Sequence, residues 1–325
     1  MKPKIQDVAK AAGVSPTTVS RVLNNRGYIS QATKDKVYDA METINYIPND
    51  LARSLYNQKT NLIGVIVPST SNPFYGELVA EIEHACNTKG YKVLLCNSLH
   101  EADKEQEYWD MLQRNQVDGV IVVTYNRGLV PKNHAAPSVA IDHYISSHMH
   151  VVSSDNYQGG EAATQELLSQ GCQKPIHING PLTLDTPANL RRQAYEDVMR
   201  ENHKDPMTYE IPDVAYLNIN METIKRIFQD HPDVDGIFAS DDLLAIKVIQ
   251  YATSLGYSIP NDLKVVGYDG TDLIQTIYPE LTTIVQPIAA IAETSLTVLE
   301  KQMKHESQPE KENVLPIQMK KGHTT

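Results

Sequence analysis

From residue 62 onward the chain alternates between short apolar runs and longer amphipathic segments, and this alternation limits the folds open to it. The apolar runs are typical of buried strands, and the segments between them are typical of helices that cover a sheet. Strands are expected at 62–67, 91–96, 119–123, 139–141, 175–179, 236–239 and 264–268, and helices near 75–89, 103–115, 157–170, 188–202, 221–230 and 241–255. Such alternation predicts doubly wound α/β units with parallel sheets, although periodicity does not set the number of units.

Neither a membrane span nor an export signal is evident in the sequence. The longest apolar stretches, such as Leu62–Val67, cover about six residues, whereas a membrane helix needs roughly 20. The first ten residues, MKPKIQDVAK, are charged from the second position and contain no apolar core segment. We therefore expect a cytoplasmic protein without a membrane partner.

The three cysteines, Cys86, Cys96 and Cys172, are odd in number and have no C-x-x-C spacing. This pattern argues against a disulfide scaffold and against a cysteine zinc site. They are expected to be small buried apolar residues.

Charge is divided unevenly along the chain. Residues 1–58 hold eight Lys and Arg against five Asp and Glu, whereas the remainder holds 21 against 35. The net charge is therefore +3 for residues 1–58 and −14 for the remainder of the chain. A modestly basic segment on an acidic body indicates where a polyanion would bind, but chance variation could produce the same numbers.

Two short helices joined by a tight turn are predicted at the N-terminus. Residues 5–12 carry one apolar stripe, and Gly13 suits the left-handed residue that ends such a helix. Ser15 is a good N-cap, and Pro16 fits the first position of a second helix over 16–23. A third helix after Ser30 closes a small core and completes a helix-turn-helix unit. The apolar positions are Ile5, Val8, Ala9, Ala12, Val19, Val22, Leu23, Val37, Ala40, Met41 and Ile44.

The exposed side of the second helix carries short polar residues and one arginine. Arginine can bond guanine through two donors, threonine offers a hydroxyl and a methyl group, and serine or asparagine can hold phosphates. This mixture suits the major groove of DNA, although a solvated face on a small helical unit would look similar. The residues concerned are Thr17, Thr18, Ser20, Arg21 and Asn24.

A fourth helix is conditional. Pro48 ends the third helix and can begin another over 49–56, but so short a helix is marginal in water unless it packs against a partner. Leu55 could belong to a core or act as a wedge between base pairs in the minor groove.

The runs DVAKAAGVSPTTVSRVLN (Asp7–Asn24) and YIPNDLARSL (Tyr46–Leu55) resemble the DNA-binding head of the LacI/GalR family of bacterial transcription regulators. The resemblance continues through GYISQATKDKVYDAM, NLIGVIVPSTSNPFYGEL, NQVDGVIV, VVSSDNYQGG, FASDDLLA and VVGYDGTDL, and it covers almost the whole chain.

The resemblance implies three parts: a helix-turn-helix DNA-binding domain over 1–46, a hinge helix over 47–58, and a sugar-binding and dimerisation domain over 59–325. The last would be two doubly wound lobes of periplasmic-binding-protein type, joined by three crossings. The partners implied are double-stranded operator DNA, a small sugar effector such as sucrose or a related sugar, and a second copy of the chain.

The resemblance also implies DNA contacts. Thr17 and Arg21 match base-reading positions, and Leu55 matches a wedge at the operator centre. The proline at position 16 can make only apolar contacts. The full expected set is Ser15, Pro16, Thr17, Thr18, Ser20, Arg21, Asn24, Asn49, Ala52, Arg53 and Leu55.

Ligands in open α/β sheets bind beyond the carboxyl ends of strands, so polar residues that follow strands are candidates for the effector site. Carboxylates accept hydrogen bonds from sugar hydroxyls, arginine donates a fork of hydrogen bonds, and aromatic rings pack on apolar sugar faces. The resemblance places Asp241 where asparagine is usual and gives Asp242 a role in shaping the turn. The resemblance implies an effector cleft formed by Phe74, Tyr75, Asp142, Arg191, Asp241, Asp269 and Gln286.

An enzyme is not indicated. The chain has no G-x-S-x-G, Walker, H-E-x-x-H or G-x-G-x-x-G motif, so no cofactor is expected. The histidines of the His143–His150 segment have irregular spacing, and no metal is expected there. Two other interpretations stay open: a family member whose corepressor, a phosphoprotein or a small molecule, tightens DNA binding, and a plain sugar-binding module.

Overall fold

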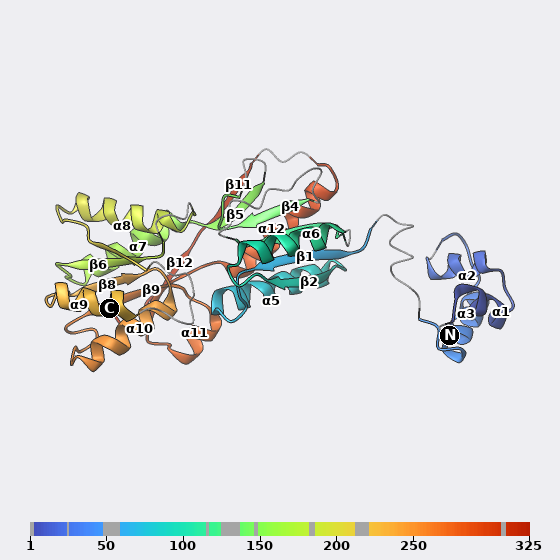
Figure 1. Ribbon diagram of the computed structural model, residues 1–325, viewed down its shortest axis with the longest axis horizontal. Helices are drawn as coiled ribbons and strands as arrows, with labels where there is room; N and C mark the ends of the chain where they lie inside the picture. Colours follow the sequence, from blue (N-terminus) through green and yellow to red (C-terminus); the bar gives the residue numbers. More distant parts are fainter. Residues whose placement is uncertain are drawn as a thin grey trace. The chain divides into compact units, whose positions relative to one another are not determined.

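The computed structural model describes residues 3–24, 26–47, 59–114, 117–124, 137–145, 149–181, 186–211, 221–306 and 310–325. It divides into two compact units, Met1–Thr60 and Asn61–Thr325, which are called the head and the body below (Figure 1).

The described part of the head contains three helices, α1 (Ile5–Ala12), α2 (Pro16–Leu23) and α3 (Gln31–Thr43). Gly13 ends α1 in the left-handed conformation, with φ 66°, as predicted. The Ser15 hydroxyl caps α2 by accepting from the Thr18 amide at 3.0 Å. The predicted apolar positions form the core: Val8, Ala9, Val19, Val22, Val37 and Ala40 are buried, and Ile5, Ala12, Leu23, Met41 and Ile44 pack around them. The helix-turn-helix prediction is confirmed.

The first sheet of the body is parallel throughout, in the order β11-β5-β4-β3-β1-β2. Its strands are β1 (Leu62–Val67), β2 (Lys92–Asn97), β3 (Gly119–Val122), β4 (Ser138–Ile141), β5 (His150–Ser154) and β11 (Glu312–Leu315). One face packs against α5 (Pro73–Thr88) and α12 (Ile288–Met303), and the other packs against α6 (Ala102–Arg114).

The second sheet has the order β12-β10-β9-β8-β6-β7 and is parallel except for β12, which runs antiparallel to β10. Its strands are β6 (Pro175–Asn179), β7 (Thr208–Glu210), β8 (Gly236–Ala239), β9 (Lys264–Asp269), β10 (Thr282–Val285) and β12 (Gln318–Lys320). One face packs against α7 (Asn156–Ser169) and α8 (Asn189–Glu201). The other packs against α9 (Met221–Asp230), α10 (Asp242–Ser254) and the short α11 (Asp272–Ile277).

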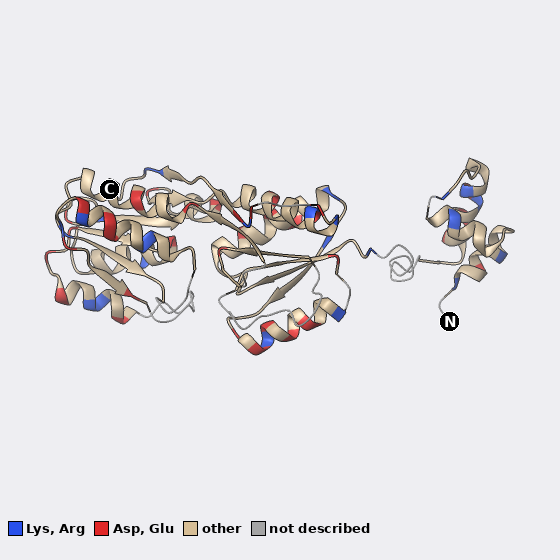
Figure 2. Ribbon diagram, turned by 90° about the horizontal axis from the view of Figure 1, so that it is seen from above, with Lys and Arg blue, Asp and Glu red and all other residues tan. Residues whose placement is uncertain are grey.

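Two lobes joined by three crossings were expected, and both are present. The chain passes between the lobes from β5 to α7, from β10 to α12, and from β11 to β12. Strands β5, β7, β10, β11 and β12 were not foreseen. Three of them, β7, β11 and β12, are edge strands, whose apolar signal is weak. Acidic and basic residues are interspersed along the helices of the body (Figure 2).

Some predictions fall on residues outside the described ranges. Residues 48–58 are among these, so the predicted hinge helix with Asn49, Ala52, Arg53 and Leu55 lies outside the described residues. None of the described helices is both long and apolar enough to span a bilayer. The three cysteines are buried free thiols, as predicted.

Gly13 gives the first testable prediction. Gly13→Val places a β-branched residue at φ 66°, which should lower the stability of the head by about 1–2 kcal/mol. Gly13→Asn should retain most of the stability, since asparagine tolerates this conformation. Scanning calorimetry of the full chain measures both variants, with the transition of the body as the internal reference. Equal stability of the valine and asparagine variants would contradict the prediction.

Candidate functional site

The exposed surface of α2 in the head carries the predicted DNA-contacting side chains. Thr17 and Arg21 are exposed, and Thr18 and Ser20 are half-buried. They therefore remain available for contact with a groove, together with the exposed ring of Pro16.

Two predicted residues of this set also have local structural roles. The Ser15 hydroxyl bonds the Thr18 amide and hydroxyl. The side-chain amide of Asn24, the C-cap of α2, donates to the Ser20 carbonyl at 2.8 Å. Tyr28, which the sequence analysis did not single out, is 98% exposed in the turn before α3. An aromatic residue so fully exposed is uncommon, and its hydroxyl is a possible donor to phosphate.

In the body, one cavity lies at the carboxyl ends of both sheets, and all seven predicted effector residues line it. The first lobe contributes Asn72, Phe74, Tyr75, Val123, Asp142 and His143; the second contributes Asn179, Gly180, Pro181, Thr186, Ala188, Asn189, Arg191, Ser240, Asp241 and Asp269; Gln286 comes from a crossing. The family resemblance and the rule that ligands bind beyond strand carboxyl ends therefore led to residues that the fold brings together.

Arg191, in the first turn of α8, is the only Lys or Arg among the described residues that line the cavity. Its Nε donates to Asn156 Oδ1 at 2.7 Å, and its Nη1 donates to the Ser240 carbonyl at 2.8 Å. The guanidinium lies 3.5 Å from the centroid of the Tyr268 ring, which supports it by a cation–π contact. The side chain is thus held in one orientation by three neighbours.

Three carboxyl groups face this arginine. Burial raises the pKa of Asp142 to about 6 and the pKa of Asp269 well above its usual value, and it raises the pKa of Asp241 as well. In each case the charge of Arg191 opposes the rise. The cavity therefore offers several carboxyl oxygens as hydrogen-bond acceptors, and burial disfavours the charged form of each group.

Two of these aspartates have unusual backbone conformations. Asp142 has φ 54° and Asp269 has φ 110°, both outside the regions that L-residues prefer. Asp142 Oδ1 is buried without a hydrogen-bond partner among the described residues. Strain and an unsatisfied buried acceptor at one cavity are typical of a ligand site.

Asp241 and Asp242 differ in role, as predicted. Asp241 lines the cavity and caps α10 by accepting from the Leu244 amide at 2.8 Å. Asp242 is 2% exposed and accepts from the Gly270 amide at 2.7 Å and the Thr283 hydroxyl at 2.5 Å. It therefore fixes the turn that follows Asp269.

Phe74 and Tyr75 form the aromatic part of the cavity. Asn72 caps α5 by accepting from the Phe74 amide at 2.8 Å, which sets both rings in the first turn. The ring centroids are 5.4 Å apart in an edge-to-face arrangement.

A hydrogen-bonded chain joins the crossings to the cavity. Asn156, which accepts from Arg191, donates to the Ser154 carbonyl at 3.0 Å. The Ser154 hydroxyl donates to Gln286 Oε1 at 2.7 Å, and Gln286 Nε2 donates to Asp269 Oδ1 at 2.7 Å. Residues from two crossings thus hold Arg191 and Asp269.

No group of three or more potential ligands that could hold a metal occurs among the residues that the structure describes. His143 lines the cavity, its Nδ1 lies 2.8 Å from the Ile141 carbonyl oxygen, and burial lowers its pKa to about 4. It is therefore a neutral ring near pH 7.

Two known protein families match different parts of this chain, one in the head and one in the body. Residues 4–49 match the bacterial regulatory proteins of the lacI family, and residues 164–325 match the periplasmic binding protein-like domain. The chain is 44% identical to the sucrose operon repressor of Pediococcus pentosaceus over 326 residues, with 100% of both chains covered. It is 42% identical to the sucrose operon repressor of Streptococcus mutans over 325 residues, again with 100% of both covered. The chain belongs to the lacI family of bacterial regulatory proteins.

A solved structure of a periplasmic binding protein/LacI transcriptional regulator from Alkaliphilus metalliredigens QYMF, complexed with D-xylulofuranose, is also similar to this lacI-family chain. The TM-score is 0.73 with 31% identity, and the match covers 82% of this chain and 99% of the other.

Several cavity residues of this lacI-family protein were missed by the sequence analysis. Asn179 directly ends strand β6, so the rule that found Asp142 could have found it. Asn72 stands before a proline and had the signature of a helix cap. Asn156 does not line the cavity but accepts a hydrogen bond from Arg191, and nothing in its local sequence indicated that bond. The others are His143, Asn189, Val123, Gly180, Pro181, Thr186, Ala188 and Ser240.

The buried carboxyl group of Asp142 gives a pH prediction. Burial raises the pKa of the folded group from its ordinary value of 3.8 to about 6, so the folded group keeps its proton to a higher pH than the unfolded one. The folded body therefore loses stability as the pH rises from about 4 to 6. Asp142→Asn should remove this loss, raising stability by about 1–3 kcal/mol at pH 7.5 and by less at pH 4.5.

Denaturant unfolding at both pH values measures the effect, and Glu107→Gln on the exposed side of α6 is the control. A gain for Asp142→Asn that does not depend on pH would contradict the prediction.

Proposed function

We propose that this protein is a sugar-responsive transcriptional repressor that binds a pseudo-palindromic operator as a homodimer and is released by a sugar effector, sucrose or a related sugar. The observation that carries the proposal is the convergence of Arg191, three aspartates and two aromatic rings on one cavity, in a chain whose head is a helix-turn-helix. The two relatives named above are sucrose operon repressors.

The chemistry of the cavity supports a neutral, hydroxyl-rich ligand. Carboxyl oxygens accept from hydroxyls, Arg191 donates to oxygens, and Phe74 and Tyr75 offer apolar faces. An anionic ligand is less well matched, because one guanidinium faces three carboxyl groups. Both lobes line the cavity, so a bound sugar would bridge them.

In this proposal each of three parts of the chain has its own role. Residues 1–46 form the DNA-binding domain, 47–58 the hinge helix and 59–325 the sugar-binding and dimerisation domain. Helix α2 enters the major groove, where Thr17 and Arg21 read bases. Ser15, Thr18, Ser20 and Asn24 bind the DNA backbone beside them, and Pro16 makes apolar contacts. Asn49, Ala52, Arg53 and Leu55 bind the central minor groove, with Leu55 as the wedge.

The mechanism is a two-state coupling. Sugar binding favours the arrangement of lobes in which paired hinge segments cannot form helices, and DNA affinity then falls. A coupling of about 2–3 kcal/mol would weaken operator binding by about 30–150-fold. The protein acts in the cytoplasm as a regulator and catalyses no reaction.

Calorimetric titration with sucrose, D-fructose and D-ribose, followed by an operator shift assay with and without each sugar, tests the proposal. Binding of one sugar together with release of the operator is the expected result. Tighter operator binding with sugar would overturn release in favour of a corepressor. Failure of all three sugars to bind would overturn the assignment of the effector.

Arg191→Ala should lower sugar affinity by about 100-fold or more and abolish release, because the charged donor that would bond the sugar oxygens is lost. Operator binding without sugar should persist. The matched control is Arg192→Ala on the same helix, where the side chain bonds Glu196 at 2.6 Å and does not line the cavity. A normal response of the Arg191 variant would remove this residue from the site.

Leu55→Ala should weaken operator binding by about tenfold or more, since the wedge that offsets unstacking is lost. Sugar affinity should stay at the wild-type value. Fluorescence anisotropy with operator DNA and calorimetry with sugar measure the two affinities on the same preparation. Unchanged operator affinity would refute the wedge role.

A further inference from the structure

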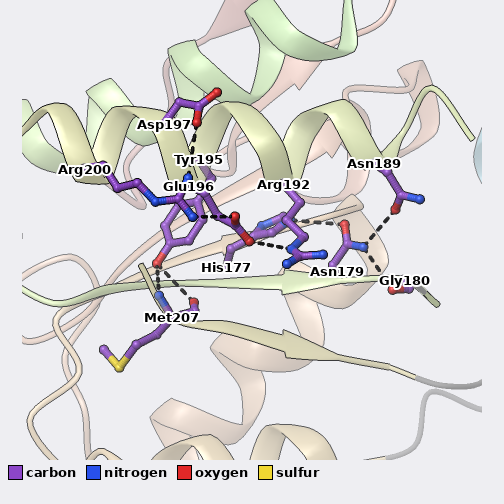
Figure 3. A network of polar contacts seen from close by, with 10 residues as sticks. All are labelled: His177, Asn179, Gly180, Asn189, Arg192, Tyr195, Glu196, Asp197, Arg200 and Met207. Atoms are coloured by element: carbon purple, nitrogen blue, oxygen red, sulfur yellow. Dashed lines mark hydrogen bonds and ion pairs between the residues drawn. The ribbon is translucent and has the colours of Figure 1, made fainter. Parts of the chain in front are cut away.

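His177 is a polar side chain in the middle of the core of the second lobe. It lies in β6 between Ile176 and Ile178, and all three residues are 0% exposed. Its ring stacks on Phe238, with centroids 4.5 Å apart. It also lies against Tyr195, with centroids 5.4 Å apart (Figure 3). An imidazole is costly at such a position unless its nitrogens have partners.

Both ring nitrogens have oxygen neighbours. Nδ1 lies 3.0 Å from the Phe238 carbonyl oxygen, and Nε2 lies 3.2 Å from Asn179 Oδ1. Burial lowers the pKa of His177 to about 4, so the ring is neutral near pH 7 and has one N–H to donate.

The Phe238 carbonyl oxygen and Asn179 Oδ1 are both acceptors, and the one N–H of the ring can donate to only one of them at a time. The Asn179 side-chain nitrogen faces the Gly180 carbonyl oxygen at 3.0 Å and Asn189 Oδ1 at 3.1 Å. Its oxygen is then the atom that faces the ring, and an oxygen of this kind can only accept. With its N–H on Nε2, His177 donates to this oxygen and supports the same orientation of the Asn179 amide that the contacts with Gly180 and Asn189 favour.

The Asn179 amide in turn reaches the effector cavity. Asn179, Gly180 and Asn189 all line it, whereas His177 does not. Asn189 is the first residue of α8, and Arg191 follows two positions later. The N-cap of this helix is Ala188, which provides no side-chain cap. The Asn179–Asn189 bond therefore ties the end of β6 to the uncapped first turn that carries Arg191 (Figure 3).

We propose that His177 is a positioning residue for the effector: it orients the Asn179 amide and, through Asn189, the first turn of α8 with Arg191. His177 thus sets sugar affinity without touching the sugar. This role rests on the proposed function of the cavity as the sugar site.

Two substitutions separate the bonds of the ring. In His177→Asn the short amide can replace Nδ1 and donate to the Phe238 carbonyl, but it does not reach Asn179. In His177→Gln the longer amide can replace Nε2 and donate to Asn179. Affinity for the sugar bound among sucrose, D-fructose and D-ribose should fall by about tenfold in His177→Asn. It should recover to within about threefold of wild type in His177→Gln.

The matched control is Tyr195→Phe, on the other side of the same ring. The Tyr195 hydroxyl bonds the Pro175 carbonyl at 2.8 Å and the Met207 carbonyl at 3.0 Å, and neither contact reaches the cavity. This variant should lose thermal stability while keeping wild-type sugar affinity. Loss of stability alone is thereby distinguished from loss of positioning.

Calorimetry and thermal unfolding of the full-length variants, together with crystal structures of wild type and His177→Asn, give the result. Unchanged affinity in His177→Asn, or equal losses in the asparagine and glutamine variants, would overturn the positioning role. If wild type binds none of the three sugars, the effector assignment fails, and the crystal structures decide the role of His177. A persisting Asn179–Asn189 contact in His177→Asn would then overturn it, and a broken contact would uphold it.

Discussion

The buried guanidinium of Arg191 is the group on which the arrangement of the cavity depends. A charge taken out of water is costly unless it is paired and hydrogen-bonded. Here the charge is offset by Asp142, Asp241 and Asp269, and its donors are directed at Asn156 and Ser240. Burial disfavours the charged form of these carboxyl groups and raises their pKa values, although the charge of Arg191 opposes the rise. The result is a site rich in both donors and acceptors, which suits hydroxyl groups better than ions.

The same arginine connects the cavity to the crossings between lobes. Through Asn156, Ser154 and Gln286 the hydrogen bonds return to Asp269. A ligand that changes the contacts of Arg191 or Asp269 therefore acts directly on the segments about which the lobes would turn. A further contact joins the lobes, since the Asp272 amide donates to Glu77 Oε2 at 2.8 Å. Ligand binding can therefore be coupled to the arrangement of the lobes through these few hydrogen bonds, and no longer series of contacts through the core is required.

Each lobe places its chemistry at one edge because its strands are parallel. Parallel strands bring their carboxyl ends together, and loops that follow them meet there. Helix caps supply part of this chemistry: Asn72 and Asp241 both begin helices and both line the cavity. Asp242 and His177 do not line the cavity but contact residues close to its lining. Asp242 accepts from Gly270 in the turn after Asp269. His177 contacts Asn179.

Local rules were sufficient for much of this protein. Gly13, Ser15 and Pro16 determined the helix-turn-helix by their own backbone preferences, and apolar periodicity located most strands and helices of both lobes. The family resemblance, together with the position of polar residues after strands, led to the seven predicted effector residues, all of which line the cavity. Only the tertiary structure decided that Asn156 binds Arg191 and that His177 binds Asn179, and it alone assigned the edge strands β11 and β12 to their sheets. The physical reason is that periodicity and capping depend on neighbours within a few residues, whereas these bonds depend on which distant groups close packing brings within about 3 Å.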